Sequence, residues 1–167
     1  MNYIKITKHD IANGSGVRVV LWVSGCSLHC KGCQNPSTWD VSTGQLFDET
    51  AKNELFKALN KPYVQGLTLS GGHPLEAQNL DEVYNIVSEV RKIFPEKDIW
   101  LYTGLTWENA IQDPRRFQIL QMCDVVVDGS FIEWQKNISL KFRGSSNQRL
   151  IDVKRTLQEN KIITLEE

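Results

Sequence analysis

Three of the chain's four cysteines lie within eight residues, and their spacing constrains this chain more than any other feature. Cys26, Cys30 and Cys33 form a Cys-x3-Cys-x2-Cys pattern directly after the apolar run 17–23. Three thiolates from one loop can ligate three irons of a cubane cluster, whereas a cluster used only for electron transfer normally has four cysteine ligands. The pattern therefore predicts a 4Fe–4S cluster with one iron open to a small molecule.

Disulfide and zinc chemistry are alternative uses of these cysteines. A disulfide framework is typical of small secreted chains, but residues 1–8 lack the apolar stretch of a signal peptide. A structural zinc site could recruit His29 or Cys123, although such sites usually have two separated ligand pairs and the sequence has no second pair. Both alternatives fit the spacing less well than the cluster does.

A redox pair is the third alternative. Cys30 and Cys33 alone have the spacing of a thioredoxin-type motif, which would leave Cys26 without a role. Cys123 precedes the apolar run 125–127, and free cysteine is among the most often buried residue types. We therefore expect Cys123 in the core and the other three cysteines as metal ligands.

Length and charge fit a compact domain spanning residues 1–167. The 19 basic and 20 acidic residues nearly cancel, and no long run of like charge suggests a nucleic acid or a membrane surface as partner. No apolar stretch approaches the roughly 20 residues that span a bilayer. We expect a cytoplasmic protein that contacts neither nucleic acid nor membrane.

Apolar runs alternate with amphipathic segments along the chain, which is typical of βα units. Strands are expected at residues 17–24, 66–70, 98–103, 124–128 and 149–152, with a last extended segment at 162–165. Helices are expected at 50–59, 79–94, 115–122 and 153–159, with Asn79 as an N-cap and Asp113-Pro114 before the third. Five or six mostly parallel strands are too few for a closed eight-stranded barrel. The predicted fold is therefore α/β, an open, partial (βα) barrel.

A second loop with unusual composition follows the expected strand 66–70. Gly71 and Gly72 permit a positive φ or a close approach to a ligand, and Pro74 stiffens the exit. Alone, such a glycine turn (residues 71–74) is more often an ordinary connection. Ligands of parallel sheets, however, lie beyond the carboxyl ends of the strands, where the cysteine loop (residues 25–33) also begins. We expect the two loops to meet in one crevice.

Further short motifs stand in a characteristic order around these two loops. They are Asn13-Gly14-Ser15-Gly16-Val17-Arg18, Cys33-Gln34-Asn35-Pro36, Tyr102-Thr103-Gly104, Val127-Asp128-Gly129 and Arg143-Gly144-Ser145-Ser146-Asn147-Gln148-Arg149. With the cysteine loop and the glycine turn, this order resembles the activating enzymes of anaerobic ribonucleoside-triphosphate reductase. These are glycyl-radical activating enzymes of the radical S-adenosylmethionine superfamily, and the likeness covers nearly the whole chain.

The resemblance implies a site residue by residue. It makes Cys26, Cys30 and Cys33 the cluster ligands, and it makes Gly32, Cys33, Gln34, Gly71, Gly72 and His73 the S-adenosylmethionine-binding residues. Gly32 and Gln34 match backbone positions beside the adenine, and the glycine turn matches the turn that receives the methionine amino group. No residue of the chain is assigned as catalytic.

This chain departs from the family pattern at His73, where an acidic residue is usual. If the turn binds through its backbone, replacing His73 by Asp should preserve activity. His9, His29 and His73 have no evident carboxylate partner, so none is assigned acid–base work. Gly14-Ser15-Gly16 lacks the spacing and the following helix of a dinucleotide loop.

Arg18 and the segment 143–149 each have two possible interpretations. Arg18 is either a solvated arginine at a strand start or a residue with a role in the site. The segment 143–149 is either an exposed loop or a surface that lines the cavity or meets a partner.

The activity implied is that of an oxidoreductase. It cleaves S-adenosylmethionine reductively with one 4Fe–4S cluster and generates a glycyl radical. The partners implied are the large subunit of anaerobic ribonucleoside-triphosphate reductase and a one-electron donor such as flavodoxin. The alternatives are an activase of another glycyl-radical enzyme, an enzyme acting on a small molecule, or a non-catalytic iron–sulfur or zinc-binding module.

Overall fold

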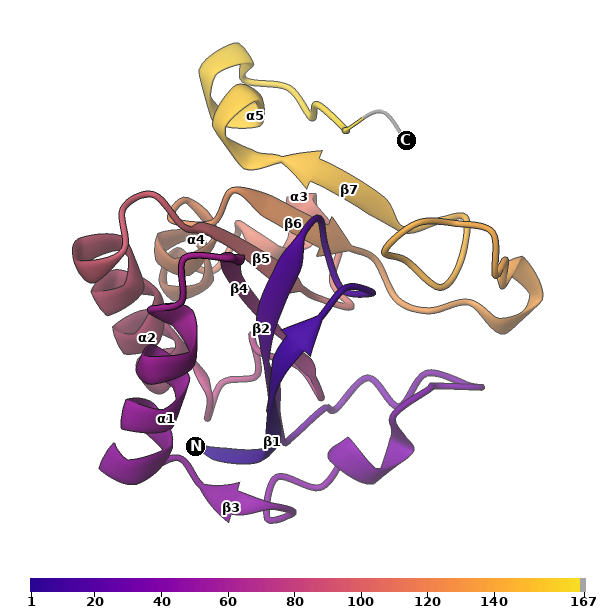
Figure 1. Cartoon of the computed structure of the whole chain (residues 1–167). Helices are drawn as coiled ribbons and strands as arrows, with labels where there is room; N and C mark the ends of the chain where they lie inside the picture. The colour runs from indigo at the N-terminus through magenta and orange to yellow at the C-terminus, as the bar shows by residue number, and fades with distance from the viewer. Residues whose placement is uncertain (166–167) are drawn as a thin grey trace.

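The structure, a computed structural model, describes residues 1–165 and contains one seven-stranded sheet with helices packed mainly on one face (Figure 1). The strands are β1 (Asn2–Asp10), β2 (Val17–Val23), β3 (Gln45–Leu46), β4 (Val64–Gly71), β5 (Asp98–Tyr102), β6 (Val125–Asp128) and β7 (Arg149–Asp152). The helices are α1 (Glu49–Leu59), α2 (Leu80–Ile93), α3 (Trp107–Ala110), α4 (Pro114–Leu120) and α5 (Val153–Glu159), with 3-10 turns at Pro36–Thr38 and Glu133–Gln135.

The strand order is β3-β1-β2-β4-β5-β6-β7, so the sheet has two edges and is open. The four central strands, β2, β4, β5 and β6, are mutually parallel, whereas β1, β3 and β7 pair antiparallel. The mixed α/β class and the open sheet are confirmed. The expectation of five or six strands was wrong, because β1 and β3 carry no regular apolar alternation, as their burial patterns reflect.

The main core lies between the sheet and helices α1, α2 and α4, which Figure 1 places together on one side. Helix α2 buries Val83, Ile86, Val87 and Val90, the helical period that the sequence predicts. On the opposite face, a smaller cluster contains Trp100, and Phe142 packs edge-on against this indole at 5.3 Å between ring centroids. The long segment between β6 and β7 therefore covers the face that the helices leave open.

Two expected helix starts have different outcomes. Asp113 caps α4 through a bond from the backbone N–H of Arg115 to its carboxylate, as Asp-Pro predicts. Asn79 occupies the N-cap position of α2, but its side chain makes no capping bond. Its Nδ2 instead donates to the carbonyls of Ser24 and His73, at 2.9 and 3.1 Å, which ties the end of β2 to the glycine turn.

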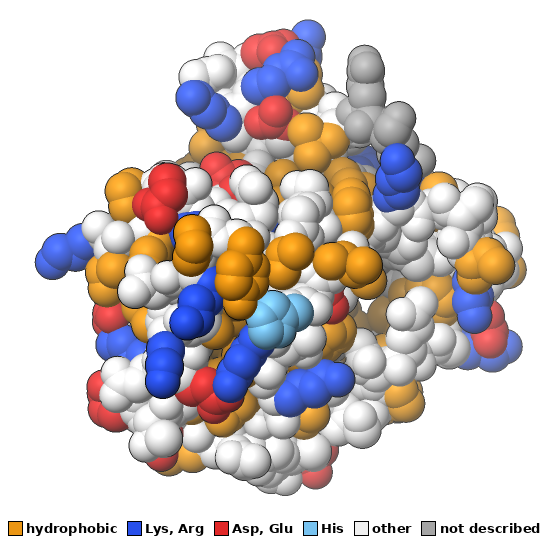
Figure 2. Space-filling view, in the orientation of Figure 1, with side chains coloured by type: hydrophobic (Ala, Val, Ile, Leu, Met, Phe, Trp, Pro, Cys, Tyr) orange, Lys and Arg blue, Asp and Glu red, His pale blue; other side chains and the backbone are white. Residues whose placement is uncertain are grey.

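Charges of both signs are spread over the face in Figure 2, with hydrophobic side chains between them, in keeping with a formal net charge of −1. Within the described part of the chain, no helix combines the length and the apolar character that crossing a membrane requires.

A candidate site at the carboxyl ends of the parallel strands

The cysteine loop and the glycine turn lie side by side because they follow neighbouring parallel strands. Val23 at the end of β2 pairs with Gly71 at the end of β4. Just beyond, the N–H of Gly72 donates to the Val23 carbonyl and the N–H of His73 donates to the Gly25 carbonyl, each at 2.8 Å. The predicted meeting of the two loops at one edge of the sheet is therefore confirmed.

The two glycines of the turn permit this contact. Gly71 has a φ of +106°, which a residue with a side chain rarely adopts. A Cβ on Gly72 would lie 2.6 Å from the Gly25 carbonyl oxygen. Gly72 is therefore required by the approach of the cysteine loop, a reason that the sequence alone does not reveal.

Both loops line one cleft of about 410 Å³. The residues expected in the site that line it are Cys26, Cys30, Cys33, Gln34, Gly71, Gly72 and His73. Gly32 is the exception: it has a φ of +73°, and a Cβ there would contact the Glu133 side chain at 3.0 Å. Gly32 thus lies against the segment that follows β6 and does not line the cleft.

Between β2 and the first 3-10 turn, the cysteine loop contains no helix or strand, and its cysteines form no disulfide bond. The N–H of Cys33 donates to the Cys30 carbonyl at 3.1 Å, and the N–H of Asn35 donates to Cys33 Sγ at 3.3 Å. Burial raises the pKa of the Cys26 thiol. Within the described residues, no three potential metal ligands are already gathered into one group.

The donor set nevertheless fits an iron–sulfur cluster. Three thiols face one cleft, and an N–H already points at the sulfur of Cys33, a contact of the kind that tunes cluster potentials. The loop holding them is free of helix or strand constraints. When bound, a cluster would be held by Cys26, Cys30 and Cys33.

His73 is buried, with only 3% of its surface exposed, and both ring nitrogens have partners. Its Nδ1 lies 3.1 Å from Glu76 Oε1, and its Nε2 lies 2.8 Å from Thr103 Oγ1. The expectation of a histidine without a carboxylate partner was therefore wrong for His73. The other two histidines are not in the cleft lining: His9 stacks on Tyr63, and His29, within the cysteine loop, stacks on Trp39.

Glu76 is a site residue that sequence reasoning missed. Its Oε1 accepts from the N–H and the hydroxyl of Ser27, at 2.9 and 2.8 Å, as well as facing His73. The hydrogen bond with His73 is the main cause that lowers the pKa of Glu76 to about 2. The i,i+3 spacing from His73 was visible in the sequence, but the contact with Ser27 was not.

The third wall of the cleft comes from the end of β5 and from the segment between β6 and β7. Tyr102, Thr103 and Phe131 line it, and the Tyr102 hydroxyl donates to the Phe142 carbonyl at 2.6 Å. Burial raises the pKa of Tyr102, which keeps this donor protonated. The Tyr102-Thr103-Gly104 motif therefore lines the cleft, a place that its sequence alone does not indicate.

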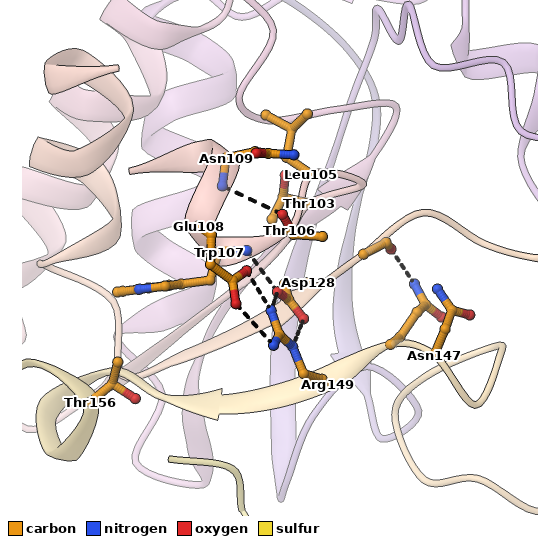
Figure 3. A network of polar contacts seen from close by, with 12 residues as sticks. Thr103, Leu105, Thr106, Trp107, Glu108, Asn109, Asp128, Asn147, Arg149 and Thr156 are labelled. Atoms are coloured by element: carbon orange, nitrogen blue, oxygen red, sulfur yellow. Dashed lines mark hydrogen bonds and ion pairs between the residues drawn. The ribbon is translucent and has the colours of Figure 1, made fainter. Parts of the chain in front are cut away.

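Three residues of the segment 143–149 contribute to this wall, and its last residue, Arg149, supports the fold. Arg143, Gly144 and Gln148 line the cleft, in line with the cavity-lining interpretation. Arg149 instead binds Asp128 with two nitrogens and also contacts Glu108 at 2.9 Å (Figure 3). These two carboxylates raise the pKa of the Arg149 guanidinium and link β7, β6 and α3.

Arg18 lies outside the cleft lining and is fully buried, so the solvated interpretation was wrong. Its guanidinium donates to Thr68 Oγ1 and to the Ser15 and Leu67 carbonyls. A Cβ on Gly14 would approach Arg18 to 2.7 Å, which explains the glycine before β2. Arg18 therefore supports the strands that carry the site.

Comparison with known proteins agrees with this geometry. A family model described as a 4Fe-4S single cluster domain matches residues 12–151. A protein of Enterobacteria phage T4 is 49% identical over 152 residues, covering 90% of this chain and 93% of the relative. Relatives from Escherichia coli strain K12 and Haemophilus influenzae are 42% and 41% identical, each covering 89% of this chain and 96% of the relative.

All three relatives carry the name anaerobic ribonucleoside-triphosphate reductase-activating protein. The similarity extends through both loops of the cleft and nearly the whole sheet, and it confirms the resemblance drawn from the order of the motifs. The chain therefore belongs to the family of anaerobic ribonucleoside-triphosphate reductase-activating proteins.

Proposed function

We propose that this chain activates the large subunit of anaerobic ribonucleoside-triphosphate reductase by generating a glycyl radical on it. In this proposal, residues 1–167 form a single domain, an open partial barrel of the radical S-adenosylmethionine type. The observation that carries the proposal is the convergence of two loops on one cleft. The three clustered cysteines and the glycine turn, although far apart in sequence, line the same 410 Å³ space.

A bound 4Fe–4S cluster would supply the chemistry, transferring one electron from a donor such as flavodoxin to S-adenosylmethionine. A carbon–sulfur bond of S-adenosylmethionine would then break, giving methionine and a 5′-deoxyadenosyl radical. That radical would take a hydrogen atom from the Cα of a glycine in the reductase. The products are 5′-deoxyadenosine and a glycyl radical.

The residues of the cleft would bind and orient the reactants. Cys26, Cys30 and Cys33 would hold three irons, leaving the fourth for the methionine amino and carboxylate groups. The backbone of Gly71–His73 would receive the amino group, and the backbone around Gln34 would contact the adenine. The apolar rings of Phe131 and Phe142, both in the cleft lining, would limit water near the reacting carbon.

Anaerobic reconstitution tests this function. The protein is loaded with iron and sulfide, reduced with dithionite and mixed with S-adenosylmethionine, and 5′-deoxyadenosine is quantified by chromatography. An activating enzyme forms 5′-deoxyadenosine in a cluster-dependent way. A protein that takes up iron or zinc and forms none is a metal-binding module, and this result would refute the proposal.

A further inference from the structure

Glu76 connects the two loops of the cleft through one oxygen atom. Its Oε1 accepts two bonds from Ser27, the residue after Cys26, and lies 3.1 Å from His73 Nδ1. The Glu76 side chain is only 13% exposed and that of His73 is 4% exposed, so solvent competes little for the contact between these two side chains, whereas Ser27 is exposed. One carboxylate thus joins Ser27 of the cysteine loop to His73 of the glycine turn.

The contacts of His73 continue on its other side to the end of β5. A carboxylate only accepts, so Nδ1 of His73 is the donor in the contact with Glu76. Nε2 of His73 is hydrogen-bonded to Thr103 Oγ1 at 2.8 Å, and Thr103 Oγ1 also accepts the N–H of Leu105 at 3.1 Å. The chain runs from the end of β5 through His73 and Glu76 to the cysteine loop.

A second, independent contact joins the same two loops. Asn79 Nδ2 donates to the carbonyls of Ser24 and His73, one on each loop. The backbones are therefore held together even when the Glu76 carboxylate is removed. Substitution of Glu76 should leave the fold intact and loosen only the part of the cysteine loop that begins at Ser27.

We propose that Glu76 is a positioning residue that fixes the cysteine loop against the glycine turn, and that its carboxylate requires a histidine at position 73. The proposal rests on the proposed function for its consequences in S-adenosylmethionine binding. Its prediction for stability concerns only the His73–Glu76 pair and does not depend on the proposed function. An aspartate at position 73 would place two carboxylates in contact in a buried site, where like charges disfavour each other strongly.

This inference reverses the expectation that His73→Asp is harmless. The single variant should lose stability and ligand affinity. Combining it with Glu76→Gln should restore much of both, since the second carboxylate is then gone. The two substitutions should therefore be strongly non-additive, as residues in one hydrogen-bond network are.

The test is a cycle of wild type, His73→Asp, Glu76→Gln and the double variant. Glu89→Gln is the control, because Glu89 pairs with Lys52 between α1 and α2, away from the cleft lining. Chemical unfolding of the cluster-free proteins measures the coupling. Equilibrium binding of S-adenosylmethionine to the reconstituted proteins, with the electron paramagnetic resonance spectrum of the reduced cluster before and after its addition, measures positioning.

Glu76→Gln is expected to weaken S-adenosylmethionine binding by about tenfold, the loss typical of a bond to a charged group. It should also diminish the spectral change at subsaturating ligand, with cluster content unchanged. His73→Asp should bind S-adenosylmethionine more weakly than Glu76→Gln does, and the affinity of the double variant should be close to that of Glu76→Gln. Additive effects, or a Glu76→Gln variant equal to the Glu89→Gln control, would overturn the proposal. If the wild type itself forms no 5′-deoxyadenosine, the proposed function fails. The unfolding free energies of the four proteins still test the coupling between positions 73 and 76.

Discussion

Arg18 Nη2 lies 2.6 Å from Asp98 Oδ1, and this ion pair joins the start of β2 to the start of β5 across β4. The arginine side chain is 0% exposed and its guanidinium also stacks over Trp100, at 5.2 Å from the ring centroid. A buried charge is tolerated only when it is paired and hydrogen-bonded. The end of the sheet opposite the cleft is thus held by one arginine.

Removal of Arg18 should destabilise the fold. Arg18→Leu leaves Asp98 without its ion-pair partner and removes the donor to the Ser15 and Leu67 carbonyls. We expect a loss of about 3 kcal/mol in the free energy of unfolding, the lower end for a broken buried pair because Asp98 is 24% exposed. Urea unfolding measures this loss. Lys8→Ala is the control: it removes an exposed pair with Glu54, and should change stability by at most about 1 kcal/mol.

The four cysteines should separate into two classes. Replacing Cys26, Cys30 or Cys33 by Ala should abolish formation of 5′-deoxyadenosine, because each would hold one iron. Cys123→Ala should retain it, since this buried thiol donates to the Ile119 carbonyl in the helical layer. Iron and sulfide analysis together with product chromatography provides the check. Loss of the cluster in the Cys123 variant would contradict the ligand assignment.

Gly72 should tolerate no side chain. In Gly72→Ala, the new Cβ would lie 2.6 Å from one backbone oxygen and 2.9 Å from another, neither of which can rotate away. We expect a stability loss of about 1–3 kcal/mol, together with reduced binding of S-adenosylmethionine. In Gly104→Ala, in the same cleft, the one close approach is to Leu28 Cδ1, the end of a flexible side chain, so this variant should lose less. Equal losses would show that the approach of Gly72 to Gly25 is unimportant.

Cys123 should make stability fall at high pH. Burial raises its pKa from 9.0 to about 12 in the folded protein. Between pH 9 and pH 12 the thiol ionises mainly in the unfolded chain, so rising pH favours unfolding. Well below pH 9 the thiol is protonated in both the folded and the unfolded protein, so it adds no pH dependence. Relative to Cys123→Ala, the wild type should lose about 1.4 kcal/mol by pH 10. A difference that stays constant from pH 7 to pH 10 would refute the burial effect.

The parts of the fold that sequence predicts are those with local patterns. Helix α2 and the four parallel strands follow from apolar periodicity, and the parallel order then brings the two loops together. Strand β1 escaped prediction because its burial is irregular and its pairing with β2 contains register shifts. It pairs with the next strand along the chain, β2, and with the short strand β3, and no regular apolar alternation in β1 signals either pairing.

The site divides in the same way. The cysteine spacing and the glycine turn are local motifs, and both lie in the cleft. The contact of Glu76 with Ser27 spans 49 residues, and the ion pair of Arg18 with Asp98 spans even more of the chain. Such contacts depend on how the strands are ordered, so residue type alone suggested neither.

The most direct test of the account is the appearance of a radical on the partner protein. The reconstituted, reduced protein is mixed anaerobically with S-adenosylmethionine and the large subunit of anaerobic ribonucleoside-triphosphate reductase, and the electron paramagnetic resonance spectrum is recorded. We predict a doublet from a carbon-centred glycyl radical, which disappears when the partner's C-terminal glycine is replaced by Ala. Formation of 5′-deoxyadenosine without a protein radical would contradict the activating role.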